Sequence, residues 1–102
     1  MRRGTTPTLT FTTPYEASLI QDGYITFKQR GAIVADISIH DESVTVSDNS
    51  ISVELTQEQT LAMTTADTCQ AQIRLLMESG TATASNIVEI PVCPILKDGE
   101  IT

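Results

Sequence analysis

Short runs in which apolar and polar residues alternate are the feature that most constrains the fold of this chain. The run from Thr8 to Thr12 alternates and stops before Pro14, and Tyr24 to Lys28 places Ile25 and Phe27 on one face. A period of two is typical of strands with one face on a core and the other in solvent. The other inward positions at this spacing are Ile33, Ala35, Ile37 and Ile39; Val44 and Val46; Ile51, Val53 and Leu55; Ala71, Ile73, Leu75 and Met77; and Val88, Ile90 and Val92.

Turn-forming residues separate these runs. A turn at Gln29-Arg30-Gly31 follows the second run, and another is expected at residues 78–81. Between Val46 and Ile51, Asp48 and Asn49 suit the left-handed backbone that tight hairpins require. The final run, from Asn86 to Val92, contains Pro91. Because proline cannot donate a ladder hydrogen bond, we expect this strand at a sheet edge or beside a bulge.

One segment departs from the alternation and predicts a short helix from about Gln57 to Met63. Thr56 is followed three residues later by Gln59, which is the spacing of a capping box, and apolar residues lie just beyond. A helix this short is not stable alone and must pack against the sheets.

About seven strands with one helical turn between the fifth and sixth predict an all-β, immunoglobulin-like antiparallel sandwich. The 102 residues are enough for one domain, 1–102, and the Cys and Trp pattern of antibody domains is absent. The expected core comprises Phe11, Ile25, Phe27, Ile37, Val53, Leu55, Ile73, Leu75, Val88 and Ile90.

The charge of the chain is strongly acidic and uneven. The net charge is −7, and of the six basic residues two lie in the opening Met1-Arg2-Arg3, which leaves four against thirteen acidic residues. We therefore expect a flexible basic arm over residues 1–5, on an acidic body that ends in a terminal turn or tail over 97–102. Arg2 and Arg3 suit head-to-tail contacts between copies, although a frayed terminus explains the same residues. So acidic a body argues against nucleic-acid binding.

The start of the chain has basic residues but no apolar stretch after them. Gly4 to Thr10 is polar, and no run approaches the length of a membrane span. We expect synthesis and folding in the cytoplasm, with no membrane partner.

No group of residues has the spacing of a catalytic or metal site. His40 is the only histidine, and Asp41 and Glu42 directly follow it, so successive side chains of an extended segment would point to opposite sides. No serine lies in a nucleophile elbow, no glycine-rich loop suits phosphate, and no carboxylates have calcium-loop spacing. The sequence predicts no enzyme, metal or cofactor.

The two cysteines, Cys69 and Cys93, lie near the ends of the last hairpin. Counting from Ile73 places Cys69 on the inward face, whereas counting from Val92 places Cys93 on the outward face. We expect both to be free thiols and Cys69 to be buried.

Several stretches of the chain resemble small proteins of prophage structural regions of Firmicutes. These stretches are the opening from Arg2 to Phe11, Tyr24 to Gln29, Leu55 to Thr60, and the ending from Ile95 to Ile101. The resemblance implies a virion- or tail-associated immunoglobulin-like protein that acts through contacts with other phage structural proteins or with copies of itself. It implies no catalytic residue, and after synthesis it implies association with the virion.

The alternative to such a protein-contact role is a module that binds carbohydrate or another cell-surface ligand. Sugars stack on exposed aromatic rings, for which Tyr15 and Tyr24 are the candidates, and a half-buried sheet tyrosine is the other interpretation of Tyr24. The residues expected at an interaction surface are Arg2, Arg3, Tyr24 and Pro91.

Overall fold

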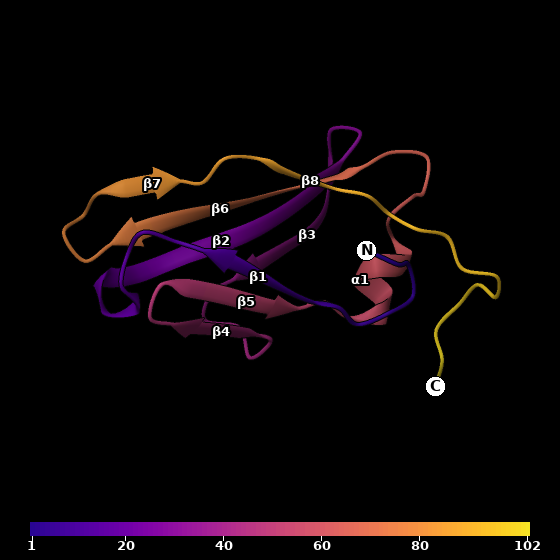
Figure 1. Cartoon of the computed structure of the whole chain (residues 1–102), viewed down its shortest axis with the longest axis horizontal. Coiled ribbons are helices and arrows are strands. Elements are labelled where there is room, and N and C mark those ends of the chain that lie inside the picture. Colours follow the sequence, from indigo (N-terminus) through magenta and orange to yellow (C-terminus); the bar gives the residue numbers. More distant parts are fainter.

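Two antiparallel sheets pack face to face in the computed structural model, which describes residues 1–102 (Figure 1). The smaller sheet has the order β1 (Thr8–Thr12), β5 (Ser50–Glu54), β4 (Val44–Ser47). The larger sheet has the order β3 (Ala32–Ser38), β2 (Ile20–Gln29), β6 (Cys69–Met77), and its last position is shared by β7 (Ala82–Ala84) and β8 (Val88–Ile90). The predicted all-β sandwich is confirmed.

The two sheets are joined by three crossing connections. A 3-10 turn, η1 (Ala17–Leu19), leads from β1 to β2, and a turn leads from β3 to β4. The helix α1 (Gln57–Leu61) leads from β5 to β6, which is the crossing expected between the fifth and sixth strands. The predicted capping box is present: Thr56 Oγ1 accepts from Gln59 N at 3.1 Å, and Thr56 N donates to Gln59 Oε1 at 2.8 Å. The helix ends at Leu61, two residues short of the predicted Met63.

Tight turns close the three hairpins β2–β3, β4–β5 and β6–β7 where the sequence predicts them, and between β6 and β7 Gly80 has a φ of 89°. Between β2 and β3 both turn residues have positive φ, 52° at Arg30 and 79° at Gly31, as a type I′ turn requires. Between β4 and β5 Asp48 has a φ of 45°.

The core lies between the sheets and follows the predicted inward positions closely. Ile25 and Phe27 on β2 are fully buried and pair with Ile73 and Ala71 on β6. Of the ten predicted core residues, seven are buried: Ile25, Phe27, Ile37, Val53, Leu55, Ile73 and Leu75.

A β-bulge in the β2–β3 hairpin places Ile33 outside the core, contrary to the prediction. Phe27 pairs with Ala35, but the next residue, Lys28, pairs with Ile33, so Val34 has no partner on β2. This extra residue reverses the side-chain direction for the rest of the strand toward the turn. Ile33 is 59% exposed as a result.

The structure has eight strands in place of about seven, because β7 (Ala82–Ala84) is an additional strand before the predicted last strand, Asn86–Val92, of which only β8 (Val88–Ile90) forms. Both β7 and β8 pair with β6, but their registers differ by one residue, and the break lies at residues 85–87. Ser85 spans the break: its N–H donates to Ile73 O at 2.8 Å, and its Oγ accepts from Ile73 N at 3.0 Å. Val88 shares the inward face with its partner Ala71, yet it is 45% exposed.

Three residues predicted in the core are thus less buried than expected. Val88 is exposed, while Phe11 and Ile90 are only partly buried. All three lie where β1 faces β7 and β8, so their incomplete burial has one cause.

Gly23 on β2 packs directly against the backbone of β6. A Cβ atom at this position would lie 2.6 Å from Arg74 O and 2.8 Å from Leu75 Cδ2. Only glycine allows the two central strands to come together here.

Gln29, which the sequence analysis placed in a turn, is instead the last residue of β2 and is buried on the same face as Ile25 and Phe27, where its side chain fixes the connection from α1 to β6. Its Nε2 donates to Thr64 O at 2.8 Å and to Asp67 O at 3.0 Å, and its Oε1 accepts from Thr64 N at 2.8 Å. The amide therefore satisfies three backbone groups of one loop.

We expect Gln29→Ala to lower the free energy of unfolding by about 1–3 kcal/mol, because it removes three part-buried hydrogen bonds to backbone groups of the loop. Urea denaturation measures this change, and hydrogen exchange should accelerate at the Thr64 amide. Gln21→Ala, on an exposed position of the same strand, is the matched control and should change little. Equal losses for the two variants would contradict the role of Gln29.

Candidate functional site

A groove opens along the side of the sandwich where β1 faces β7 and β8. Its volume is about 550 Å³, and no residue of its lining carries a charge. The apolar part of the lining comes from both sheets: Leu9, Phe11 and Ile51 from the smaller sheet, and Ile73, Leu75, Val88 and Ile90 from the larger. Thr13, Pro14 and Tyr15 also line it, just beyond the end of β1.

The groove exists because the two sheets differ in width. The smaller sheet ends at β1, whereas the larger sheet continues to β7 and β8, which lie beyond β1 when the layers are viewed from above (Figure 1). The inward side chains of Val88 and Ile90 therefore have no strand of the smaller sheet opposite them. This explains why Val88, Ile90 and Phe11 are more exposed than their inward direction predicts.

The outer edge of β1 presents unpaired backbone groups beside this groove. Thr13 N donates to Asn49 O and Leu55 N donates to Pro7 O, so the odd-numbered residues of the β1 segment bond to β5. The N–H and C=O groups of Thr8, Thr10 and Thr12 point the other way. Since β1 pairs with no other strand, these groups have no ladder partner.

The other sheet edges are bulged, broken or shorter, whereas β1 is regular over its five residues, with Pro7 directly before it and Pro14 beyond it. The β3 edge has the bulge at Val34, and the β7–β8 edge is broken at residues 85–87 and followed by Pro91. The β4 edge is only four residues long. Within Thr8–Thr12 there is no proline, bulge or charge, and the whole stretch from Gly4 to Tyr15 is uncharged. Over Thr8–Thr12 nothing within the strand itself blocks pairing with a further strand.

Tyr24, one of the predicted interaction residues, lies on the outer face of the larger sheet. Its side chain is 49% exposed and shares a shallow depression of about 370 Å³ with Asp22, Asp36 and Arg74. Tyr24 pairs directly with Arg74 on β6. Tyr15, the other aromatic candidate, is partly buried and lines the groove instead.

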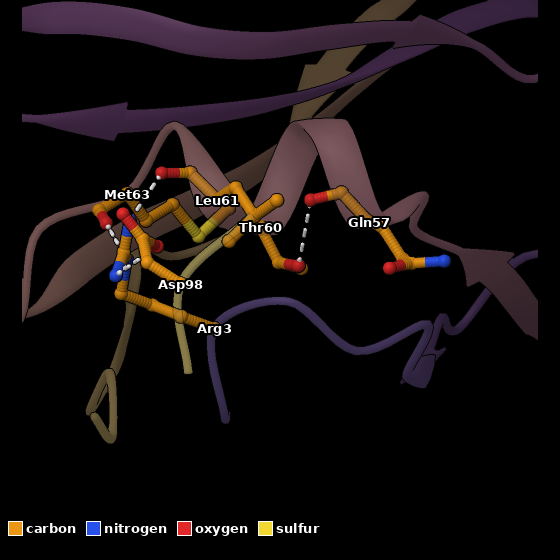
Figure 2. A network of polar contacts seen from close by, with 6 residues as sticks. All are labelled: Arg3, Gln57, Thr60, Leu61, Met63 and Asp98. Atoms are coloured by element: carbon orange, nitrogen blue, oxygen red, sulfur yellow. Dashed lines mark hydrogen bonds and ion pairs between the residues drawn. The ribbon is translucent and has the colours of Figure 1, made fainter. Parts of the chain in front are cut away.

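The predicted basic arm is hydrogen-bonded to its own chain, so a free arm is not what the structure contains (Figure 2). Arg3 Nε donates to Met63 O at 2.7 Å and its Nη2 donates to Leu61 O at 2.8 Å. Its Nη1 lies 3.4 Å from Asp98 Oδ1. The guanidinium thus takes up carbonyls at and just past the end of α1, where a cation is favourable.

The backbone of this arm also pairs with the segment after β8. Arg2 and Cys93 form a parallel bridge, with Arg3 N donating to Cys93 O and Cys93 N donating to Met1 O. The amino group of Met1 donates to Pro91 O at 2.6 Å, and Arg2 Nη1 donates to Pro94 O at 2.6 Å. Pro91 therefore lies just past the edge strand β8, and its carbonyl anchors the N-terminus.

The remaining polar residues form no further cluster. His40 Nε2 lies 3.1 Å from Gln21 O and 3.4 Å from Asp22 Oδ1 on the surface. No group of three or more potential metal ligands is present.

Hydrogen bonds from the side chain and backbone of Ser43 lower the pKa of Asp41. No helix has the length and apolar character to cross a membrane.

Both cysteines are free thiols, as predicted. Cys69 is fully buried on the inward face, and burial raises the pKa of its thiol. Cys93 is only partly exposed, in the segment that pairs with the N-terminus.

Comparison with known proteins assigns no family. No family model matches the chain, and no curated protein is significantly similar to it.

The sequence did not predict the groove, although it contained one sign of it. Of the four candidates, Arg2, Arg3 and Pro91 lie close together where the N-terminal segment pairs with the segment after β8, Tyr24 lies apart on the outer face of the larger sheet, and none of the four lines the groove. The sign was the absence of charge from Gly4 to Tyr15 in a chain of net charge −7.

We expect Arg3→Ala to lower the free energy of unfolding by about 1–3 kcal/mol, because two part-buried carbonyls lose a charged donor. Arg2→Ala makes the same change of charge at an exposed position and should alter stability by no more than about 0.5 kcal/mol. Urea denaturation of the two variants tests this difference. Indistinguishable effects would show that the contacts of Arg3 do not stabilise the fold.

Proposed function

We propose that this protein is a non-catalytic structural protein of a phage or prophage virion, associated with the tail, which acts through protein–protein contacts. The observation that carries the contact role is the uncharged groove beside the unpaired edge of β1. A monomeric domain rarely leaves an apolar surface and a strand edge open at the same place, because together they promote association.

The assignment to a virion rests on the resemblance of four stretches of the chain to prophage structural proteins. The physical features are compatible with it. The domain is elongated, with extents of 47 × 28 × 17 Å, and exposes an uncharged edge strand on an otherwise acidic surface. Such an edge is suited to contacts in a permanent assembly.

Detection of the chain in particles tests this function. We expect that, after induction of the strain that encodes it, the chain co-sediments with purified virions at a constant copy number, measured by quantitative mass spectrometry. Capsid, tail or lysis genes should neighbour its gene. Particles from a deletion strain are the control. A chain that stays in the soluble fraction while complete particles form without it would contradict the proposal.

A second candidate function, carbohydrate binding, is favoured by the depression around Tyr24. An exposed ring with Asp36 and Arg74 beside it offers a stacking face and hydrogen-bond partners for a sugar.

If sugar binds there, Tyr24→Ala should abolish binding to a bacterial cell-wall polysaccharide fraction in a pull-down assay, whereas Tyr15→Ala should not. Retention of binding by both variants, or no binding by the unmodified protein, would rule out this site.

A further inference from the structure

We infer that the groove receives one extended segment of another protein, which adds as a strand to β1 and covers β7 and β8. This inference rests on the proposed function and names the chemistry of the partner. The segment is uncharged over about five residues, the length of β1, and has aliphatic side chains at alternate positions.

The hydrogen-bonding groups of β1 suit a strand. Thr8, Thr10 and Thr12 each direct an N–H and a C=O away from β5, at every second residue along the edge. An incoming strand satisfies these groups with its own backbone, independently of its sequence. A small ligand of compact shape leaves most of them unpaired.

The apolar surface specifies the side chains of that strand. A strand added to β1 continues the smaller sheet, and every second side chain then points toward Leu75, Val88 and Ile90. The lining is mainly aliphatic and contains no charge. Branched aliphatic residues are therefore favoured at inward positions, and a charged residue there would be buried without a partner.

The shape of the edge excludes a second copy that pairs through its own β1. In such a dimer the two β1 strands run antiparallel in one continuous sheet, about a two-fold axis perpendicular to it. Because β7 and β8 project past β1 in each copy, the larger sheets would occupy the same space (Figure 1). A single added strand fits over the projecting β7 and β8, but the edge of a second sandwich does not.

The charged residues within 1–3 and 95–102 also disfavour these two segments as the occupant. The segment after Pro94 contains Lys97, Asp98 and Glu100, and the first three residues contain two arginines. Neither offers five uncharged residues with apolar side chains at alternate positions. Glu16 follows the groove at one end and Glu54 lies beside Thr8 at the other, so basic residues flanking the apolar stretch of the partner are favoured.

An intramolecular strand tests the inference on the full chain. Thr-Val-Thr-Val-Thr is joined to Met1 through Gly-Ser-Gly, and the control carries a Gly-Ser extension of equal length. We expect the amides of Thr8, Thr10 and Thr12 to exchange at least about tenfold more slowly with the strand extension than with the control. The thermal midpoint should rise by about 4–8 °C. Unchanged exchange at all three amides would overturn the inference.

Two substitutions then locate the strand. Val88→Lys in the extended protein should remove the gain, because it puts a charge in the groove. Ile33→Lys, at another exposed aliphatic position, on the opposite edge of the larger sheet, should preserve the gain. Loss of the gain in both variants, or in neither, would show that the strand does not lie over β8.

The partner is tested in trans with the unextended protein. The acetylated peptide of the same five residues, flanked by lysines, should shift the amide resonances of Thr8, Thr10 and Thr12, and the protein alone should sediment as a monomer. A dimer that Val88→Lys dissociates would assign the groove to a second copy and overturn the partner assignment. Virion detection is independent of these measurements, so either proposal can fail without the other.

Discussion

The antiparallel pairing of β2 with β6 is the interaction on which the rest of the structure depends. It runs from Ile20 opposite Met77 to Lys28 opposite Gln70, and so joins segments more than forty residues apart. Closing so long a loop costs conformational entropy, which burial of Ile25 and Phe27 against β6 offsets. Gly23 permits the close approach at one end of this pairing, and Gln29 holds the returning loop at the other.

Residues 1–3 and the segment after β8 lie side by side at the α1 end of the sandwich, and the residues of the predicted basic arm form hydrogen bonds there. Arg3 binds carbonyls at the end of α1, and the backbone of residues 1–3 pairs with the segment after β8. Arg3 is thus held within the chain, whereas Arg2 stays exposed and donates to Pro94 O.

The groove follows from the unequal widths of the sheets rather than from any special residue. In a sandwich each strand of one sheet is normally covered by a strand of the other, because inward apolar side chains gain stability only when they are covered. Here the covering strand over β7 and β8 is missing. Two features follow from this: the outward backbone groups of β1 have no partner, and the side chains of Val88 and Ile90 are not covered. A single added strand would therefore pair with the first and cover the second.

The sequence by itself determined the direction of most side chains and the position of the helix. Period-two alternation sets which residues share a face, and the capping box between Thr56 and Gln59 is a local interaction between neighbours in the chain. The bulge at Val34, which turns Ile33 outward, depends on pairing between strands and was not evident from the alternation. Burial depends on what lies opposite in the other sheet, so only the tertiary structure decided that Gln29 is enclosed and Val88 is not.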